Sequence, residues 1–560
     1  MHGNEPILAV EDVAITFDGK QPFTAVHQIS FAIGRGKTLA IVGESGSGKS
    51  LTALSLMGLL PATASVKGRM FLNTVDDTYA LHELKDTHQW MQVRGRKAGM
   101  IFQEPMSALN PVLKVGSQLA EAILAGHDVT LHEANKLAVS WLDKVQLPFP
   151  EKIYHRYPHQ LSGGQKQRVM IAMAMCNDPV LLIADEPTTA LDVTVQADII
   201  QLMKQLQQTH HTAMLFITHD LALASTIADE VLVLYKGEIV EYGATAQVLH
   251  APKHPYTAAL LACRPSAQQK NKKLPVVEDF LDTGVSTIKP EGMPPVQVTN
   301  AELLKVKDLN VWFVGRKEPG KPVSYFKAVD DVSFTLHKGE VLGLVGESGC
   351  GKSTLSRSLI GLLPVHSGSI LYNNKELAHA APKVWYDVRR DIQMIFQDPY
   401  ASLNPRLTIG DAIMEPMRVH NIVPVKQLQQ EMLRLLDLVH LPADAAHRYP
   451  HQFSGGQRQR IGIARALALQ PKLLICDESV SALDVSVQAQ ILNLLKELQY
   501  EFQLTYLFIS HDLGVVYYIS DRVMVMQTGK IVEAGTAEQV LKHPVNEYTG
   551  KLVGAMPKLL

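Results

Sequence analysis

Cysteine, unbalanced charge and long apolar runs are all scarce in this sequence, and each scarcity excludes a class of protein. The 4 cysteines lie far apart without a C-x-x-C pair, which excludes a disulfide framework and a cysteine metal site and indicates reduced, cytosolic thiols. The 53 Lys and Arg nearly balance the 55 Asp and Glu, so bulk charge does not favour binding to nucleic acid. No uncharged apolar run reaches the length that crosses a bilayer, and the opening "MHGNEPILAVEDV" lacks the features of a secretory signal. We therefore expect a soluble or peripheral protein.

An internal repeat organises the chain, whose 560 residues would otherwise suggest three or four domains, or fewer if these are large α/β units. Four pairs of segments carry the repeat: "GESGSGKS" at 43–50 and "GESGCGKS" at 346–353, "MIFQEP" at 100–105 and "MIFQDP" at 394–399, "LLIADEP" at 181–187 and "LLICDES" at 473–479, and "FITHDL" at 216–221 and "FISHDL" at 508–513. The order is the same in both halves, and the offset drifts only from 303 residues at the first pair to 292 at the last two. We interpret this as one duplicated domain.

The composition between the repeats predicts where the domains meet. Residues 264–300 are polar, contain proline and show little periodicity, which is typical of a linker. We therefore predict one domain over 1–263 and a second over 301–560. Short apolar runs such as "VLLIAD" alternate with helical patterns, which favours an α/β fold with a parallel sheet in each domain. The segment between "MIFQ" and "SGGQ" is helical in pattern and predicts a smaller helical subdomain.

Each half contains a phosphate-binding loop of the pattern G-x-x-x-x-G-K-[ST], between a strand-like and a helix-like segment. Its glycines allow backbone N–H groups to surround a phosphate, its lysine reaches the β- and γ-phosphate oxygens, and its serine can ligate Mg²⁺. A lone match can arise by chance, but two matches in this context make chance negligible. The predicted loop residues are Gly43, Ser45, Gly46, Gly48, Lys49 and Ser50 in the first half, and Gly346, Ser348, Gly349, Gly351, Lys352 and Ser353 in the second.

Polar residues at the ends of other apolar runs complete the predicted chemistry. An acid in such a place is usually a helix cap or a solvated turn, but here an acidic pair follows a phosphate loop at domain-scale distance, which favours a catalytic role. We predict that the aspartates hold Mg²⁺, that the glutamates polarise the attacking water, that the histidines contact the γ-phosphate, and that the glutamines sense Mg²⁺ or water. These residues are Asp185 and Asp477, Glu186 and Glu478, His219 and His511, and Gln103 and Gln397.

"LSGGQKQR" from Leu161 and "FSGGQRQR" from Phe453 also look suited to an anion, because two glycines begin a helix that offers free N–H groups. Neither copy has a phosphate-gripping lysine before its helix. With the phosphate loop, glutamine, SGGQ, Asp-Glu and histidine in this order, the chain resembles the ATPase subunits of ABC transporters over nearly its whole length, twice.

That resemblance implies two P-loop NTPase domains arranged head to tail, so that the SGGQ segment of each domain covers the nucleotide held by the other. Ser454, Gly455, Gly456 and Gln457 would complete the site on Lys49, and Ser162, Gly163, Gly164 and Gln165 the site on Lys352. The stretches "ALD" at 190–192 and 482–484 match the segment that crosses the domain seam. Phe17 and Phe313 are the candidates for stacking on adenine, with Phe23 and Phe326 as competitors.

The end of each half narrows the resemblance. "HAPKHPYTAALLACRP" at 250–265 resembles the tail of oligopeptide and dipeptide importer ATPases, and "KHPVNEYTGKLVGAMP" at 542–557 is a looser copy. Separate-chain relatives often carry a cysteine cluster after this tail. Only Cys263 is present here, so we predict no iron–sulfur cluster. "DESVSALD" in the second half also lacks the proline that usually follows the glutamate, which puts the rigidity of that loop in question.

The resemblance implies a fused ATPase subunit that takes ATP and Mg²⁺ and powers import of peptides or related solutes. Its partners would be two transmembrane permease subunits and an extracytoplasmic solute-binding protein, with no nucleic acid. Its place would be the cytoplasmic face of a bacterial inner membrane, held peripherally. A tandem ATPase acting on ribosomes is the alternative, although such proteins have a longer, basic linker and no such tail. A DNA-repair ATPase would need zinc cysteines that this chain lacks.

Cys350 stands in the second phosphate loop where the first has Ser47. A small buried side chain at a variable position is one interpretation. The other is that Lys352 and the start of the following helix favour the thiolate and so raise its reactivity. We predict that a small alkylating reagent inactivates the protein through Cys350, that bound Mg-ATP protects it, and that Cys350→Ser confers resistance.

Overall fold

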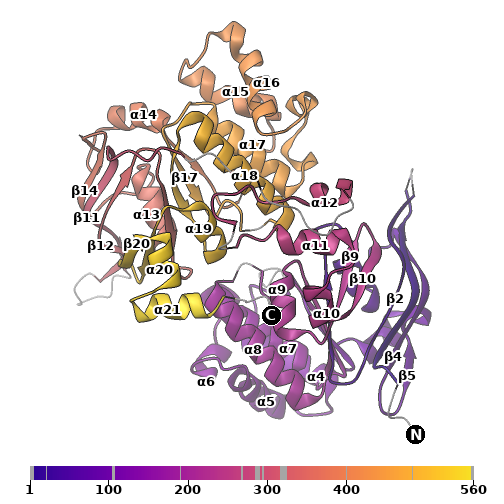
Figure 1. The fold of residues 1–560 in the computed structure, drawn as a ribbon. Coiled ribbons are helices and arrows are strands. Elements are labelled where there is room, and N and C mark those ends of the chain that lie inside the picture. Colours follow the sequence, from indigo (N-terminus) through magenta and orange to yellow (C-terminus); the bar gives the residue numbers. More distant parts are fainter. Residues whose placement is uncertain are drawn as a thin grey trace.

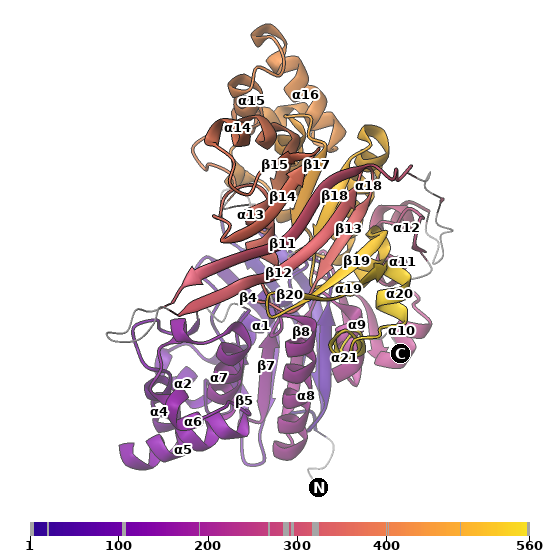
Figure 2. The same ribbon diagram turned by 90° about the vertical axis from the view of Figure 1, so that its left-hand side faces the viewer.

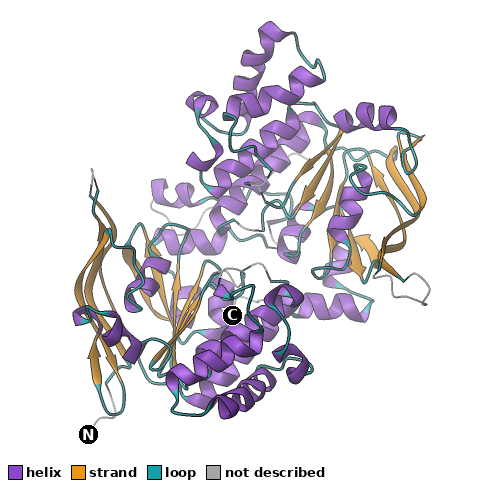
Figure 3. Cartoon of the chain, turned by 180° about the vertical axis from the view of Figure 1, so that it is seen from behind, coloured by secondary structure: helices purple, strands orange, loops and turns teal. Residues whose placement is uncertain are grey.

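The computed structural model describes residues 5–19, 22–103, 108–189, 191–266, 269–283, 291–292, 296–315, 324–398, 400, 402–481 and 483–556. Within these ranges the chain forms two halves of the same α/β architecture, one above the other in Figure 1. This confirms the predicted fold class. Seen from behind, the strands of the two halves gather at opposite flanks of the molecule, and helices fill the space between them (Figure 3).

The first half contains two sheets. Its strands are β1 (Leu8–Phe17), β2 (Phe23–Ile33), β3 (Thr38–Val42), β4 (Ala64–Asn73), β5 (Thr78–Ala80), β6 (Ala98–Ile101), β7 (Leu181–Asp185), β8 (Ala213–Thr218), β9 (Glu230–Tyr235) and β10 (Glu238–Ala244). A four-stranded antiparallel sheet has the order β2-β1-β4-β5, and a six-stranded sheet has the order β10-β9-β3-β8-β7-β6. In the larger sheet β9, β3, β8, β7 and β6 are parallel neighbours, and only β10 runs antiparallel.

The apolar runs of the sequence explain the larger sheet. Every residue of β3, β7 and β8 is buried, as expected for strands that are covered on both faces. The helices of this half are α1 (Lys49–Leu56), α2 (Thr87–Val93), α4 (Val115–Gly126), α5 (Leu131–Lys144), α6 (Pro150–Tyr154), α7 (Gly163–Met175), α8 (Val193–His210), α9 (Leu221–Ile227), α10 (Thr245–His250) and α11 (Pro255–Ala262). Helices α4, α5 and α7 share one apolar cluster, which is the predicted helical subdomain.

The second half repeats this arrangement. Its strands are β11 (Glu302–Val314), β12 (Tyr325–His337), β13 (Val341–Val345), β14 (Ser367–Tyr372), β15 (Lys375–Glu376), β16 (Ile392–Ile395), β17 (Leu473–Asp477), β18 (Thr505–Ile509), β19 (Arg522–Gln527) and β20 (Lys530–Thr536). Its helices are α13 (Lys352–Leu359), α14 (Pro382–Asp391), α15 (Ile409–Val419), α16 (Leu428–Leu438), α17 (Gly455–Leu467), α18 (Val485–Phe502), α19 (Leu513–Ile519), α20 (Ala537–Lys542) and α21 (Glu547–Gly554). The sheet orders are β12-β11-β14-β15 and β16-β17-β18-β13-β19-β20, so the strand order of the first half is preserved.

The C-terminal helix of each half contacts the opposite half. Helix α11 contacts α18 of the second half, and α21 contacts α8 of the first, where it lies beside α8 in both Figure 1 and Figure 2. The stretch predicted as a linker is also more ordered than its composition suggests, because it contains the short helix α12 (Val277–Thr283). Val277 and Phe280 are buried in an apolar cluster that spans both halves, and α12 contacts α11 of the first half. Leu274 exchanges two buried backbone hydrogen bonds of 2.9 and 2.8 Å with the Asn493 side chain on α18, which fixes this segment to the second half.

Candidate functional site

The first phosphate loop joins the buried strand β3 to helix α1. Lys49 Nζ donates hydrogen bonds of 2.8 Å to the carbonyl oxygens of Gly43 and Glu44, so the loop itself holds the ammonium in place. Ser50 Oγ lies 3.1 Å from Asp185 Oδ1 at the end of β7. The loop therefore brings a cation and a hydroxyl–carboxylate pair to the same edge of the sheet.

Glycine is required where the loop turns into the helix. Gly48 has φ of 104°, a conformation that favours glycine, and a Cβ there would lie 2.8 Å from Val26 Cγ2. Gly351 in the second half has φ of 116° and is equally confined, since a Cβ would lie 2.2 Å from the Ala328 carbonyl oxygen. Free N–H groups at the start of each helix thus remain open to a phosphate.

Glu186 lies at the centre of a polar cluster. Gln103 Nε2 donates a 3.1 Å hydrogen bond to Glu186 Oε2, Thr189 Oγ1 donates a 2.9 Å bond to the same oxygen, and His219 Nδ1 is 3.4 Å from Glu186 Oε1. Burial favours a high pKa for Glu186, but the hydrogen bond and charge of His219, with Thr189 and Lys49, lower the pKa to about 2. Glu186 is therefore ionised at neutral pH, as a group that orients a water molecule must be.

The pKa values of the neighbouring Asp185 and His219 are both raised, whereas that of Glu186 is lowered. Burial raises the pKa of Asp185 to about 6, against the hydrogen bond from Ser50. Burial lowers the pKa of His219, but its contacts with Glu186 outweigh this and raise the pKa overall. Glu186 also has a positive φ of 45°, unusual for a residue with a side chain, and such strain gathers at functional sites.

The second half reproduces these contacts almost one for one. Its distances are 2.6 and 2.9 Å from Lys352 Nζ to the carbonyl oxygens of Gly346 and Glu347, 3.3 Å from Ser353 Oγ to Asp477 Oδ1, 2.7 Å from Gln397 Nε2 to Glu478 Oε2, and 3.6 Å from His511 Nδ1 to Glu478 Oε2. Glu478 has the same positive φ, at 49°. The structure therefore brings together the predicted lysine, serine, aspartate, glutamate, histidine and glutamine in both halves.

Each phosphate loop faces residues of the opposite half. A cavity of about 410 Å³ over the second loop is lined by Lys352 and Ser353, and also by Leu191 and Asp192 of the first half. At the equivalent place in the other half, the backbone N–H of Ser45 in the first loop donates a 2.9 Å hydrogen bond to Asp484 Oδ1 of the second half. These contacts come from the two "ALD" stretches, of which Ala190 and Ala482 lie outside the described residues.

The two SGGQ segments begin helices, as predicted. Ser162 caps α7, because its hydroxyl accepts a 3.3 Å hydrogen bond from the Gln165 N–H, while the Gln165 side chain accepts one from the Ser162 N–H. Ser454 and Gln457 make the same capping box on α17. Among the described hydrogen bonds, none joins either segment to the opposite phosphate loop, so their covering role stays a prediction.

The aromatic candidates lie in pairs on the antiparallel hairpins. Phe17 pairs with Phe23 and Phe313 pairs with Phe326. Phe326 lines the cavity over the second loop. Phe17 packs partly into the core of its half, whereas Phe313 is half-exposed. The choice between the members of each pair stays a prediction, with Phe326 the better placed in this structure.

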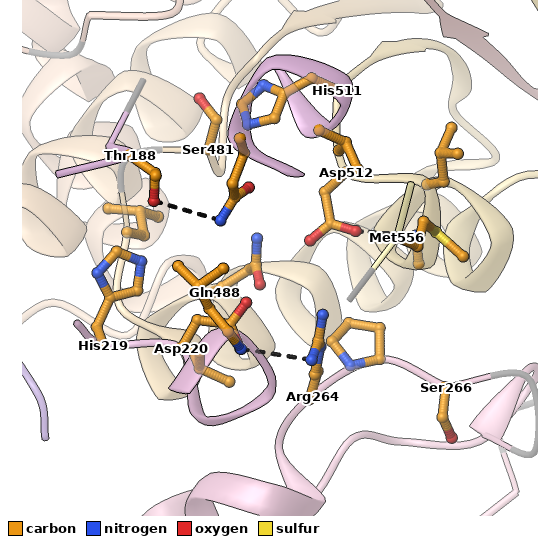
Figure 4. A pocket seen from close by; sticks show the side chains of 18 of the residues that line it. Thr188, His219, Asp220, Arg264, Ser266, Ser481, Gln488, His511, Asp512 and Met556 are labelled. Atoms are coloured by element: carbon orange, nitrogen blue, oxygen red, sulfur yellow. Dashed lines mark hydrogen bonds and ion pairs between the residues drawn. The ribbon is translucent and has the colours of Figure 1, made fainter. Parts of the chain in front are cut away.

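A second cavity, of about 590 Å³, lies between the halves (Figure 4). His219 and His511, one from each half, face it from different sides, and Glu186 also lines it. Arg264 Nη1 lies 3.4 Å from Asp220 Oδ1, which also caps α9. Sequence analysis missed Arg264 as a lining residue, because it stands in the stretch assigned to the linker.

Sequence analysis also missed a contact between each phosphate loop and the tail of its own half. The Glu44 N–H donates a 3.0 Å hydrogen bond to the hydroxyl of Tyr256 on α11, and the Glu347 N–H donates a 3.1 Å bond to Tyr548 on α21. The only signal in the sequence is the shared Tyr-Thr pair in the two tails.

The expectation that Lys352 and the helix start favour the Cys350 thiolate is wrong. The thiol is buried, at 7% exposure, and burial raises its pKa even though Lys352 acts in the opposite direction. Lys352 Nζ is 4.0 Å from the sulfur, but its short hydrogen bonds go to two carbonyl oxygens. Desolvation of the thiolate therefore outweighs the neighbouring charge.

The described ranges contain no group of three or more His, Cys, Asp or Glu side chains arranged to hold a metal. Ser50 with Asp185, and Ser353 with Asp477, nevertheless fit Mg²⁺, because that ion takes few protein oxygens and completes its shell with water and phosphate. In the same ranges, no helix has both the length and the apolar character needed to cross a membrane.

Comparison with known proteins gives consistent matches over both halves. The family model described as "ABC transporter" matches residues 26–189 and 329–481, and "Oligopeptide/dipeptide transporter, C-terminal region" matches 240–281 and 532–560. The chain is 48% identical over 560 residues to the glutathione import ATP-binding protein GsiA of Escherichia coli (strain K12), covering 98% of this chain and 89% of that protein. The GsiA protein of Shigella dysenteriae serotype 1 (strain Sd197) is 49% identical over 561 residues, with the same coverage. Among solved structures, a post-hydrolysis state of the ATP-binding cassette MJ0796 bound to ADP and Pi is 26% identical, with a TM-score of 0.38 over 42% of this chain and 98% of that one.

Proposed function

Because this chain belongs to the ABC transporter family of ATP-binding proteins, we propose that it is the energy-coupling ATPase subunit of a bacterial importer for glutathione or related peptides. The observation that carries the proposal is the same cluster of lysine, serine, aspartate, glutamate, histidine and glutamine in both halves, each half ending in a tail of the oligopeptide/dipeptide transporter type. Proteins of this family hydrolyse ATP, and this chain is an ATPase of that class. The relatives are import proteins, so a role on ribosomes is not supported.

The chemistry at each site follows from the contacts. Lys49, held by its two loop carbonyls, directs its remaining N–H at the β- and γ-phosphates, and the open N–H groups at the start of α1 cradle them. Ser50 and Asp185 would hold Mg²⁺, which neutralises phosphate charge when it is bound. Ionised Glu186, held by Gln103 and His219, accepts a hydrogen bond from the attacking water and takes its proton. The second half does the same with Lys352, Ser353, Asp477, Glu478, Gln397 and His511.

Closure of the two halves would complete each site. Ser454, Gly455, Gly456 and Gln457 would reach the nucleotide on Lys49, and Ser162, Gly163, Gly164 and Gln165 the one on Lys352. The contact between Ser45 and Asp484 supports this head-to-tail arrangement, since it joins a phosphate loop to the opposite half. Hydrolysis would then let the halves part and move the permeases.

An importer subunit of this kind works with membrane permeases and a substrate-binding protein. We propose two permease subunits, an extracytoplasmic solute-binding protein, and a peripheral position on the cytoplasmic face of the inner membrane. No iron–sulfur cluster is expected, because Cys263 is the only cysteine near the tail of the first half. The boundaries 1–263, 264–300 and 301–560 remain our proposed domain division.

The test is ATP hydrolysis by the reconstituted transporter. We expect its binding protein loaded with glutathione to stimulate phosphate release above the unloaded level, and dipeptides or longer peptides to stimulate it less. A chain carrying Glu186→Gln and Glu478→Gln in the same transporter is the control for contaminating ATPases. Stimulation by dipeptide alone would change the solute, and failure of every peptide-type solute would overturn the proposed function.

A further inference from the structure

The tail of each half contacts the phosphate loop at one particular peptide unit. The peptide that joins Gly43 to Glu44 has its carbonyl on Gly43 and its N–H on Glu44. Its carbonyl oxygen accepts a 2.8 Å hydrogen bond from Lys49 Nζ, and its N–H donates a 3.0 Å bond to the Tyr256 hydroxyl. The lysine and the tyrosine therefore lie at the two ends of the same peptide group.

The second half has the same arrangement. Lys352 Nζ donates a 2.6 Å hydrogen bond to the Gly346 carbonyl, and the adjoining Glu347 N–H donates a 3.1 Å bond to the Tyr548 hydroxyl. The two tails are only loosely similar in sequence, yet both bring a tyrosine hydroxyl to this N–H. The repetition argues against a chance contact in one half.

The peptide unit has little freedom to move elsewhere. A Cβ on Gly43 would lie 2.2 Å from the Leu234 carbonyl oxygen, and one on Gly346 would lie 2.2 Å from the Met526 carbonyl oxygen, so strands β9 and β19 close one side of each loop. Tyr256 is fully buried, and its ring centre lies 4.3 Å from that of Tyr235. A buried ring and a packed loop hold the hydroxyl at a fixed distance from the N–H.

We propose that Tyr256 and Tyr548 are positioning residues for Lys49 and Lys352. A hydrogen bond at one end of a peptide group polarises the group and strengthens the bond at its other end. Each tyrosine thus fixes the plane of the carbonyl that holds the lysine, and so sets where the ammonium waits for the β- and γ-phosphates. The tyrosine does not touch the nucleotide, and it acts only through this peptide.

The same peptide lies at the seam between the halves. The Glu44 carboxylate is hydrogen-bonded to the Ser486 hydroxyl at the start of α18, and Thr194 Oγ1 at the start of α8 donates a 2.9 Å bond to Glu347 Oε1. The tail helix α11 also packs on α18, and α21 packs on α8. The position of each loop lysine before nucleotide binds therefore depends on contacts that the loop and the tail make with the opposite half.

The test removes one hydroxyl at a time in the full chain. In Tyr256→Phe the ring is kept, so we expect the unliganded protein to melt within about 2 °C of wild type, a small shift for a chain of this size. Binding of 8-azido-ATP, assigned to each half by photolabelling and peptide mapping, should weaken roughly three- to tenfold at the first loop, which is the range for one lost hydrogen bond, and stay unchanged at the second. Tyr548→Phe should do the reverse. Tyr242→Phe is the matched control, because its hydroxyl donates to Glu230 on the β9–β10 hairpin and not to a loop.

A double-mutant cycle separates positioning from general support. In a Lys49→Gln background the effect of Tyr256→Phe on labelling of the first loop should disappear, because the group that it positions is gone. An effect that persists in that background, equal losses at both loops, or unchanged binding would each overturn the inference. This inference rests on the proposed nucleotide sites. If wild type itself shows no label in the loops, the sites fail and the inference fails with them, whereas normal wild-type labelling with an unchanged Tyr256→Phe overturns the inference alone.

Discussion

The two halves are closest to each other where they hold the nucleotide and differ most where they meet the rest of the chain. The turn after the catalytic acid shows the first point. Pro187 follows Glu186 in one half and Ser479 follows Glu478 in the other, yet both glutamates have a positive φ and both N–H groups bond the next strand, at 3.0 and 2.9 Å. The missing proline therefore does not alter the turn, because the neighbouring strand holds it.

The outer faces of the two long helices show the second point. Lys204 on α8 is exposed, whereas Lys496, at the matching position on α18, is half-buried with its ammonium 4.1 Å from the centre of the Tyr518 ring. The difference arises because the connection between the halves lies on α18 and nothing comparable lies on α8 among the described residues. Duplication preserved the site, while the connection made the surroundings unequal.

The largest expected effect on ATP hydrolysis comes from substituting the glutamate of either site, which tests whether the two sites contribute equally. We expect Glu186→Gln and Glu478→Gln each to reduce turnover roughly 10²- to 10⁴-fold, the usual contribution of a general base, while nucleotide still binds. The measurement is phosphate release by the reconstituted transporter, together with equilibrium binding of ATP. A single substitution that leaves transport-coupled hydrolysis unchanged would show that only one site works.

The head-to-tail relation is tested at the SGGQ segments. Ser454→Arg should weaken nucleotide capture on Lys49 roughly ten- to 10²-fold after closure, because a large side chain misplaces the covering segment, and should spare Lys352. Ser162→Arg is the mirror control and should affect the other loop. Photolabelling of each loop distinguishes them. Damage confined to the half that carries the substitution contradicts the arrangement.

The phosphate loops differ in chemistry at one position, Ser47 against Cys350. Since burial raises the pKa of the thiol and shields the sulfur, we expect iodoacetamide to modify Cys350 more slowly than free glutathione at pH 8. Ser47→Cys should give a second thiol of similar slowness, and Cys350→Ser should change ATP hydrolysis little. Mass spectrometry of the modified peptides gives the rates. Rapid inactivation of wild type that Cys350→Ser prevents would restore the reactive-thiol hypothesis.

The smallest expected effect is on how the free energy of unfolding changes with pH. Burial lowers the pKa of Lys496 from 10.5 to about 8 in the folded chain, with Lys270 acting in the same direction and Asp521 against it. Between about pH 8 and pH 10.5 the unfolded chain therefore holds more protons, so the free energy of unfolding rises with pH, by about 1 kcal/mol at this partly exposed site. Lys496→Met should flatten that rise and Lys204→Met should not. Urea unfolding at pH 8 and pH 10 measures it, and equal slopes in both variants would refute the assignment.

Much of the fold and most of the site were predictable, because the signals are local. The apolar run at 38–42 is strand β3, the glycine-rich loop follows it, and Ser162 begins a helix as its capping box requires. The helix-like segment after the first loop, "LTALSLMGLL" at 51–60, continues past Leu56, where α1 ends because Gly58 and Pro61 follow. Apolar periodicity alone does not show where a glycine or a proline ends a helix.

The misses depend on contacts between segments far apart in the chain. The burial of Cys350 decides its pKa, and burial is a property of the assembled core that a neighbouring lysine in the sequence does not reveal. The bond from Glu44 to Tyr256 joins residues 212 apart, and the bonds from Leu274 to Asn493 join residues 219 apart. Composition marked the segment around Leu274 as a linker, because its few apolar side chains are buried only in the assembled core that both halves build.

The anchored connection between the halves also determines how pairing of the two ATPase halves depends on protein concentration. Two free ATPase subunits would pair according to their concentrations. Here a tether that is fixed to α18 at Leu274 holds the two halves at an effective concentration on the order of millimolar. Pairing then no longer depends on how much protein the cell makes, and the two sites are always present in a ratio of one to one. Differences that have accumulated between the halves are consequently inherited together, as a matched pair that cannot be reassorted.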